Sequence, residues 1–308
     1  MSLTQPRSPI RSSKEAAVPA PSAVLASRAM ESQKTALPLP IQVFTERIED
    51  DPVLDTATSH ALLRRVASGE ITESLRLYTP DPAVMFSMLD AHRPGFEQAE
   101  RQAQEAGFPG VFRLAGGHAA LFHSECLAFA WAMPVAEKHD GIRSRFEMVS
   151  HWICQGLIRV GVPAQVGEVP GEYCPGEYSV NASGKAKLMG GQRVIRGAAH
   201  VGGVIVVRHA EAVRDVLSKV YETLELDWKP ETAGAVEDSV PGITTTAVRE
   251  ALLDELSQIR RVEIGALPVE TRDLGRELTP WHSPRENPKG RATALGRKVV
   301  AVSSSAES

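Results

Sequence analysis

Apolar residues between positions 75 and 259 fall into two patterns, short uninterrupted runs and spacings of three to four residues. The first pattern predicts strands and the second predicts helices, so the chain is expected to have an α/β (α+β) fold. The strongest helical pattern covers 142–160, and others cover 93–107, 210–224 and a segment from Thr245 or Thr246 to Ile259. Strand-like runs are expected at 111–114, 118–122, 127–133, 164–166, 177–180 and 198–207. Short breaks between the first three runs favour a meander.

The two ends of the chain differ in composition from this central part. Residues 1–40 hold six Pro, seven Ser, seven Ala and no aromatic residue, so they bury too little apolar surface to offset the entropy of ordering. We therefore expect a disordered N-terminal tail at 1–40, a folded domain at 41–265 and a largely disordered C-terminal extension at 266–308. The first 30 residues are basic, as in an organelle transit peptide, but four prolines would break the amphipathic helix that such a peptide needs.

Composition excludes several classes of protein. A net charge of −4 gives no global field for nucleic acid or an anionic membrane, and no apolar run approaches the length of a membrane-spanning helix. Three cysteines form no disulfide framework, which indicates a reducing compartment, the cytoplasm. Cys126 and Cys154 lie in a predicted strand and a predicted helix and are interpreted as core residues. The cysteines lack metal-ligand spacing, so no metal site is expected.

A glycine pair separates two of the predicted strands. Gly116 and Gly117 allow positive φ angles and let main-chain N–H groups approach a ligand closely. Arg113, three residues earlier, could bind a carboxylate or a phosphate. The alternative is an ordinary glycine hairpin with a surface arginine.

A cysteine followed by Pro-Gly forms the second candidate motif. Cys174 is expected in a turn, where its thiol would be accessible. A nearby Lys185, Lys187 or Arg193 would favour its thiolate form, which is the form that can take an acyl group from one thioester and hold it as another. The alternative is an inert loop cysteine beside two solvated lysines.

One further pattern resembles another class of enzyme, and the usual nucleotide-binding patterns are missing. The segment from Arg208 and His209 to Glu211 copies the strand-end motif of histidine phosphatases, but it stands some 200 residues into the chain, without the other residues that such an enzyme needs. We interpret it as a buried strand meeting a helix with solvated polar side chains. The chain contains neither a P-loop nor a Gly-x-Gly-x-x-Gly fingerprint after a strand.

Taken in order, these segments resemble the lipoate–protein ligase and octanoyltransferase family over about residues 70–260. The family has an Arg followed by a glycine-rich turn, and a Lys followed by a small-residue turn and Gln-Arg. The matching residues here are Arg113, Gly116, Gly117 and His118, then Lys187, Gln192 and Arg193. The Cys-Pro-Gly-Glu-Tyr segment beginning at Cys174 looks most like the cysteine-dependent lipoyl/octanoyl amidotransferase branch. This chain is one residue short between Lys187 and Gln192, which makes Lys185 an alternative for the site lysine.

The resemblance implies a class II biotinyl/lipoyl-synthetase-like domain with mixed or antiparallel sheets flanked by helices. It implies an enzyme that moves an octanoyl or lipoyl group through a thioester on Cys174 to a lysine of a lipoyl-carrier domain, with Lys187 stabilising the oxyanion. Substrate-binding residues would be Arg113, Gly116, Gly117, His118, Gln192 and Arg193. We expect the acyl chain to enter an apolar slot lined near 114–122 and 201–205.

Partners and cofactors follow from the same resemblance. The carrier would be the glycine-cleavage H protein or the E2 component of a 2-oxoacid dehydrogenase, and acyl-carrier protein is a further candidate as donor. The transferase requires no cofactor. The rival is an ATP-dependent lipoate–protein ligase on the same fold, which uses ATP and Mg, and a more remote one is a non-catalytic carrier-binding module.

Overall fold

The computed structural model describes residues 39–48, 50–136, 141–184 and 191–287, without the side chains of 192–194. Its helices are α2 (Pro52–Ala67), α3 (Phe96–Glu105), α4 (Ile142–Arg159), α5 (Ala210–Thr223), α6 (Thr245–Ile259) and α7 (Val269–His282), with the 3-10 helices η1 (Asp90–His92), η2 (Pro230–Thr232) and η3 (Val236–Asp238). Its strands are β1 (Ile41–Phe44), β2 (Ser74–Tyr78), β3 (Ala83–Phe86), β4 (Gly110–Phe112), β5 (Ala120–Phe122), β6 (Cys126–Pro134), β7 (Ala164–Val166), β8 (Val180–Ala182), β9 (Gly191–Ile195), β10 (Ala198–Val206) and β11 (Val262–Ile264).

Among the described residues, the strands form one large mixed sheet, a smaller mixed sheet and a two-stranded pair. The large sheet has the order β11-β1-β2-β6-β10-β9, the smaller one β4-β3-β5, and β7 pairs with β8. In the large sheet, β11, β1 and β2 are parallel, whereas β6 runs antiparallel to β2 and β10. The predicted α/β fold with mixed sheets and flanking helices is confirmed.

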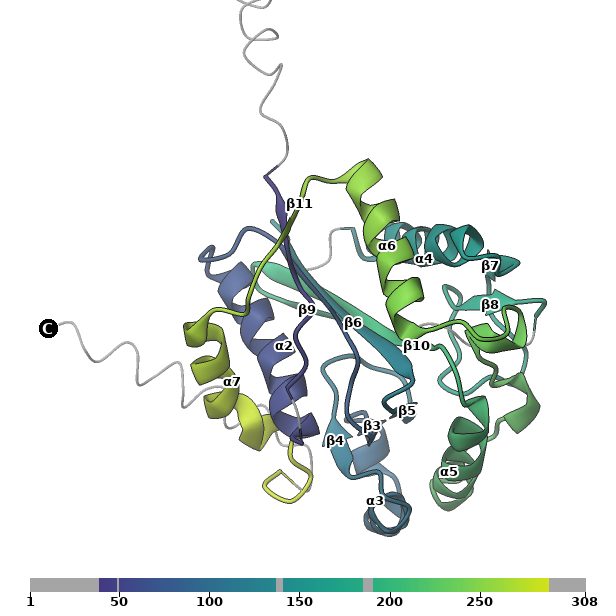
Figure 1. The fold of residues 1–308 in the computed structure, drawn as a ribbon. Coiled ribbons are helices and arrows are strands. Elements are labelled where there is room, and N and C mark those ends of the chain that lie inside the picture. The colour runs from purple at the N-terminus through teal and green to yellow at the C-terminus, as the bar shows by residue number, and fades with distance from the viewer. Residues whose placement is uncertain (1–38, 49, 137–140, 185–190, 288–308) are drawn as a thin grey trace, which may run out of the picture. The chain divides into compact units, whose positions relative to one another are not determined.

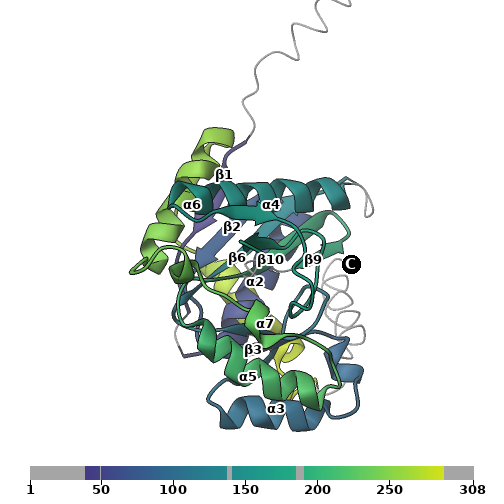
Figure 2. The same cartoon turned by 90° about the vertical axis from the view of Figure 1, so that its right-hand side faces the viewer.

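Helices cover both faces of the large sheet (Figures 1 and 2). On one face, α4 and α6 form a core in which Trp152 of α4 meets Trp131 of β6 edge to face, with ring centroids 5.3 Å apart. On the other face, α2 packs against the sheet and α7 packs against α2. A second core joins the smaller sheet to α3 and α5.

The two faces of β6 and β10 carry side chains of different size. On β6, Leu127, Phe129, Trp131 and Met133 belong to the core under α4 and α6, whereas the alternate positions are alanines at 128, 130 and 132. On β10, Gly202 pairs with Ala130 on the same small-residue face. This face leaves room for a cavity between the two sheets.

The predicted meander is wrong. β4 and β5 are not neighbours, because β3 lies between them, parallel to β4 and antiparallel to β5. β6 belongs to the other sheet. A tight turn, closed by the N–H of Cys126 donating to the carbonyl of His123 at 2.9 Å, carries the chain from one sheet to the other. Apolar runs and short breaks do not reveal such a change of sheet.

The C-terminal extension, predicted to be largely disordered, contains α7. The helix buries Leu278 against Ala57 and Ala61 of α2, with Leu274 and Trp281 packed beside them. The spacing of these apolar side chains suits a helix face, and Pro280 inside the helix hides that pattern in the sequence. The prediction is therefore corrected for 269–282. The predicted tail at 1–40 lies almost wholly outside the described residues, as do residues 288–308.

No helix in the described part of the chain combines the length and the apolar composition that crossing a bilayer requires.

Two buried histidines join α2, α7 and β4. Nδ1 of His282 contacts the carbonyl of Phe112, which can only accept, so His282 donates there and its Nε2 accepts from Nδ1 of His60 at 3.1 Å. Nε2 of His60 then accepts from Nε of Arg64 at 3.3 Å. These contacts are all satisfied when both imidazoles are neutral.

Replacing His282 with leucine is expected to lower the free energy of unfolding by about 1–3 kcal/mol, because it leaves buried groups of Phe112 and His60 without these bonds. Urea denaturation measures the change. The matched control is Arg276→Ala on the exposed part of the same helix, which should stay within about 0.5 kcal/mol of the wild type. Equal midpoints for both variants would show that the histidine chain contributes nothing.

Candidate active site

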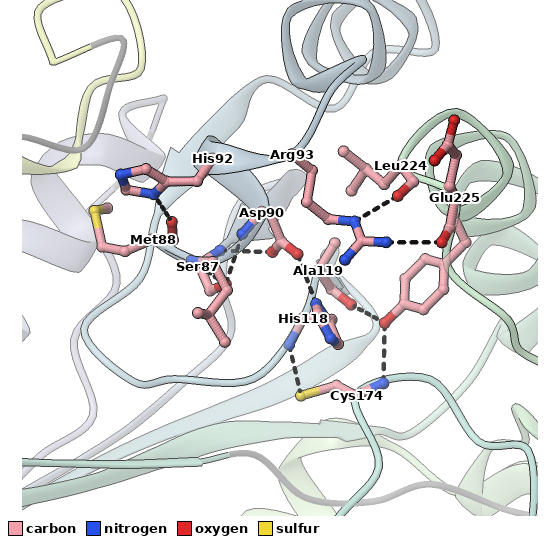
Figure 3. A network of polar contacts seen from close by, with 12 residues as sticks. Ser87, Met88, Asp90, His92, Arg93, His118, Ala119, Cys174, Leu224 and Glu225 are labelled. Atoms are coloured by element: carbon pink, nitrogen blue, oxygen red, sulfur yellow. Dashed lines mark hydrogen bonds and ion pairs between the residues drawn. The ribbon is translucent and has the colours of Figure 1, made fainter.

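Two loops meet at a buried cysteine. Residues 113–119 join β4 to β5, and residues 167–179 join β7 to β8. The sulfur of Cys174 on the second loop lies 3.1 Å from Nη2 of Arg113 on the first loop. It also lies 3.3 Å from the main-chain nitrogen of His118 on that loop (Figure 3). Both groups donate to the sulfur, so they favour its thiolate form.

The main chain of Cys174 is held in an unusual conformation. Its φ of 46° lies in the left-handed region, where a residue other than glycine is strained. Its N–H donates to the hydroxyl of Tyr221 on α5 at 2.9 Å, and this hydroxyl donates to the carbonyl of Ala119 at 2.9 Å. Tyr221 therefore fixes one loop to the other and sets the position of the sulfur.

The expected accessibility of the thiol is wrong. Cys174 lies in a turn segment as predicted, but it is only 8% exposed. The reason is that its side chain points inward to Arg113 and belongs to the core under α3 and α5.

The absence of a side chain at Gly117 leaves room for the sulfur of Cys174. The φ of Gly117 is 90°, and a Cβ at this position would lie 2.5 Å from the sulfur of Cys174 and 2.8 Å from Nη2 of Arg113. The close approach of the two loops therefore requires glycine here.

The electrostatics of the site match an ion pair between Arg113 and Cys174. Burial tends to lower the pKa of Arg113, but the charge of Cys174, its hydrogen bond and the charge of Asp90 outweigh burial, and the pKa of Arg113 is raised. Burial raises the pKa of Tyr221, and the charges of Cys174 and Asp90 add to that increase. Tyr221 thus stays a neutral hydroxyl that can both accept and donate.

A second polar pair stands behind the glycine turn. Asp90 of η1 is fully buried, and its Oδ1 lies 2.9 Å from Nδ1 of His118 (Figure 3). Its Oδ2 accepts from the main-chain N–H of Ser87 at 2.8 Å. The carbonyl of His118 accepts from Nη2 of Arg113 at 2.6 Å. The His118 main chain thus contacts both members of the Arg113–Cys174 pair.

Cavities open on two sides of Cys174. One, of about 570 Å³, is walled mainly by apolar side chains and glycines of the two sheets, and it also reaches polar residues of α2, β2 and β10. Its lining includes Met85, Leu114, Ala120, Phe122, Phe129, Gly202 and Val204, and the polar residues Thr56, Ser59, Tyr78 and His200. The other, of about 810 Å³, is lined by Gly116, Gly117, Cys174, Glu177, Tyr178 and Gly191. Because Cys174 lines both cavities, a group bonded to its sulfur would have space beside it in each of them.

Residues 51–257 match the family model for the lipoyl protein ligase A/B catalytic domain. The chain belongs to this family. The resemblance seen in the sequence is confirmed.

The similar proteins are named either octanoyltransferases or lipoate-protein ligases. An octanoyl-[GcvH]:protein N-octanoyltransferase of Geobacillus kaustophilus is 27% identical over 202 residues, covering 65% of this chain and 70% of that protein. The octanoyltransferase LipM of Exiguobacterium sibiricum is 29% identical over 125 residues, covering 39% and 43%. A solved structure of lipoate-protein ligase A bound with ATP has a TM-score of 0.63 at 18% identity and covers 78% of this chain and 94% of that one, which shows a shared fold.

The structure brings together five of the residues that the family resemblance selects. Arg113, Gly116, Gly117 and His118 lie on one loop and Cys174 on the other. Gln192 and Arg193 are in β9, opposite Val201 and His200 of β10, and their side chains are not described. Lys185 and Lys187 lie outside the described residues, so the role of Lys187 stays a prediction.

The predicted acyl slot coincides with a cavity. Its lining includes residues from 114–122 and from 202–204, as expected for a slot between the strands of those two regions. Sequence reasoning did not anticipate the α2 side of this cavity, where Thr56 and Ser59 contribute.

Two residues of the lipoyl-ligase-type site were missed in the sequence. The contact of Arg113 with the cysteine sulfur was not expected either, and its predicted substrate binding stays a prediction. Asp90 and Tyr221 were not selected at all. The spacing of Ser87 and Asp90, which bond reciprocally at the start of η1, is a local signal of a buried aspartate, but nothing in the sequence directs Tyr221 to a cysteine 47 residues away.

The phosphatase-like segment lies away from this centre. His209 is exposed at the start of α5 and pairs with Glu211 at 2.7 Å. It lines neither cavity at Cys174. Within the described ranges, no group of three or more His, Cys, Asp or Glu side chains could hold a metal ion.

Proposed function

We propose that this protein transfers an octanoyl or lipoyl group to a lysine of a lipoyl-carrier protein through a thioester on Cys174. The observation that carries the proposal is the Arg113 guanidinium, 3.1 Å from the Cys174 sulfur, where both residues line a largely apolar cavity. The thiolate is the nucleophile that acyl exchange needs, and a cationic neighbour holds it in that form.

The reaction has two halves. The Cys174 thiolate attacks the acyl carbonyl of the donor and a C–S bond forms. A donor sulfur leaves as its thiolate, and a donor nitrogen leaves as an amine after taking a proton from solvent. The ε-amine of the acceptor lysine then attacks the thioester, a C–N bond forms, and the electron pair of the C–S bond returns to the sulfur. Arg113 and the N–H of His118 stabilise the thiolate that is released. Burial of the acyl chain contributes roughly 0.8 kcal/mol per CH₂ group.

The named relatives support the carrier class. GcvH, the glycine-cleavage H protein, is the partner in the name of the Geobacillus relative. A structural neighbour from Thermoplasma acidophilum (TM-score 0.61, 18% identity) is described with its E2 lipoyl domain. We therefore propose the H protein first, E2 lipoyl domains second, and acyl-carrier protein as an alternative donor. The need for a reduced thiol fits the cytoplasm.

One observation favours the ligase as a second candidate. A cavity of about 840 Å³ shares Arg113 and Leu114 with the acyl cavity, and Arg64 and Arg196 also line it. Three guanidinium groups suit the phosphates of ATP. In that reaction ATP and Mg would be needed, and Cys174 would be incidental.

One assay separates the two candidates. The protein is mixed with an octanoyl donor protein and an acceptor lipoyl domain, with and without ATP, and the acceptor's mass is followed. Transfer without ATP supports the transferase. Modification of the acceptor only with free lipoate and ATP, accompanied by pyrophosphate release, would establish the ligase instead. Binding of the acceptor with no modification under any condition would indicate a non-catalytic module.

The Arg113→Gln variant is expected to slow alkylation of Cys174 by iodoacetamide by about tenfold, because the thiolate loses its charged partner. Mass spectrometry after timed quenching measures the rate at this residue. Arg196→Gln, which changes an exposed arginine of the neighbouring cavity, is the control and should alkylate as the wild type does. Equal alkylation rates in all three proteins would show that the ion pair between Arg113 and Cys174 does not activate the thiol.

Adding one methyl group at Gly117 is expected to reduce transfer by about 100-fold, because the new Cβ must displace the Cys174 sulfur or Arg113. The steady-state rate of Gly117→Ala tests this. Gly184→Ala is the matched control, since Gly184 also has a positive φ but an added Cβ would meet nothing within 4 Å among the described residues. If both variants lose the same activity, the effect comes from backbone strain alone.

A further inference from the structure

The second half of the proposed transfer requires proton removal. A lysine ε-amine is protonated at neutral pH, and the amide product carries one proton where the ammonium carried three. The leaving sulfur needs no proton, because Arg113 and the N–H of His118 stabilise it as a thiolate. The site therefore needs a base for the attacking amine rather than an acid for the sulfur.

His118 is placed to be that base. Its main-chain N–H contacts the Cys174 sulfur at 3.3 Å, so the imidazole belongs to a residue that directly contacts the reacting atom from the opposite loop. The side chain is 27% exposed, and Figure 3 draws the ring between Asp90 and Cys174. Nδ1 is committed to the Asp90 carboxylate at 2.9 Å, and in the described part of the chain Nε2 has no hydrogen-bond partner.

Asp90 fixes which ring nitrogen of His118 carries the hydrogen. A carboxylate can only accept, so Nδ1 of His118 carries the hydrogen and Nε2 carries the lone pair. Asp90 is itself held by Ser87, whose N–H donates to Oδ2 and whose Oγ accepts from the Asp90 N–H at 3.2 Å. A fully buried carboxylate is costly unless it is hydrogen-bonded, and its two oxygens accept from Nδ1 of His118 and from the N–H of Ser87.

The other charged or titratable groups around this imidazole have different tasks. Arg113 is bonded to the His118 carbonyl and to the sulfur, and Tyr221 of α5 bridges Ala119 and the Cys174 N–H. Arg93, beside η1, donates to the carbonyls of Leu224 and Glu225 at the end of α5. None of these described neighbours is a base with an open lone pair, whereas Nε2 of His118 has one in the described part of the chain.

Resting on the proposed function, we infer that His118 is the general base that deprotonates the acceptor lysine, with Asp90 as its positioning residue. The ε-ammonium releases one proton to solvent before attack. As the C–N bond forms, Nε2 takes a second proton, the C–S electron pair returns to sulfur, and the imidazolium passes its proton to solvent. General base catalysis of this kind contributes about 10²–10⁴-fold.

The test follows the two halves separately. The wild type and His118→Ala are first acylated with an octanoyl thioester donor, then mixed with the lipoyl domain, and the loss of enzyme-bound octanoyl is timed by intact mass. Alanine keeps the main-chain N–H that contacts the sulfur. We expect acylation to change little and lysine-dependent deacylation to fall by about 10²–10⁴-fold at pH 7. Imidazole in the buffer should restore part of it, and hydroxylamine, a neutral nucleophile, should deacylate both proteins at similar rates.

Three further variants keep the result interpretable. The double variant His118→Ala/Asp90→Asn removes the buried charge left behind and must show the same selective loss. Asp90→Asn alone should slow deacylation and change its pH profile, because the tautomer is no longer fixed. His209→Asn is the control, since His209 makes a similar contact to Glu211 at the surface, and it should behave as the wild type.

Two results would overturn the inference. One is unchanged lysine-dependent deacylation in His118→Ala. The other is an equal loss with lysine and hydroxylamine and no response to imidazole, which would indicate only a distorted loop. Failure of the wild type to become acylated at all would instead refute the proposed function.

Discussion

The Cys174→Ala variant is expected to lose acyl transfer by at least about 10³-fold, because it removes the atom that holds the acyl group between donor and acceptor. Neither of the other cysteines can replace it. Cys126 is fully buried in β6, and burial raises its pKa far above the usual range; burial also raises the pKa of Cys154. Neither residue lines a cavity at the site.

Octanoyl transfer to the H protein, followed by intact mass, measures this loss. Cys154→Ala is the matched control, since it removes a thiol from α4 that is bonded only to the carbonyl of Ala164 in the described structure. Circular dichroism shows whether each variant is folded. A Cys174→Ala protein that transfers at a tenth of the wild-type rate or faster would exclude the thioester route.

Replacing Arg76 with methionine is expected to lower the free energy of unfolding by about 3–5 kcal/mol at pH 7. Arg76 is fully buried and donates to Oδ1 of Asp55 at 2.6 Å, to the Asp55 carbonyl at 2.7 Å and to Oγ of Ser59 at 3.0 Å. Its guanidinium also stacks over the ring of Tyr78 at 3.9 Å. Methionine fills similar space but leaves the Asp55 carboxylate buried without its cation.

The pH dependence has a definite sign. Burial raises the pKa of Asp55 even with Arg76 present, which opposes the increase. In Arg76→Met that opposition is gone, so the folded state binds a proton more tightly than the unfolded state does. The stability deficit is therefore largest above the folded pKa of Asp55 and shrinks as the pH falls and the carboxyl becomes neutral.

Urea denaturation at neutral and acid pH tests both statements. The double variant Arg76→Met/Asp55→Leu should recover most of the loss, because it removes both charges together. If the double variant is no more stable than Arg76→Met, the cost comes from packing around Tyr78 rather than from an unpaired carboxylate.

Local patterns in the sequence predicted much of the fold. The helix expected at 142–160 is α4 at Ile142–Arg159, and the helix expected to end at Ile259 is α6, although its N-cap is Thr244. These segments have apolar faces with helical spacing, which tertiary structure reinforces. α2 was not predicted, because its buried surface includes Asp55, Thr56, Thr58, Ser59 and His60. Polar residues that are buried against partners far along the chain give no periodic signal.

The same limit applies to the site. The glycine turn and the Cys-Pro-Gly segment could be selected from the sequence, and the structure brings Arg113 to Cys174 across 61 positions. That contact depends on how the two loops fold together, with Tyr221 and Gly117 setting their separation. Residue types alone suggested Lys185, Lys187 or Arg193 beside the sulfur, and that stays a prediction because none of these side chains is described. The neighbour that the structure describes is Arg113.

The central claim is that Cys174 carries the acyl group as a thioester. The most direct measurement is the intact mass of the full chain after incubation with an octanoyl donor in the absence of ATP, followed by peptide mapping. The account predicts one added octanoyl group, located on Cys174, removed by hydroxylamine and absent from Cys174→Ala. An unmodified chain under these conditions, together with ATP-dependent lipoylation of the carrier by Cys174→Ala, would contradict it.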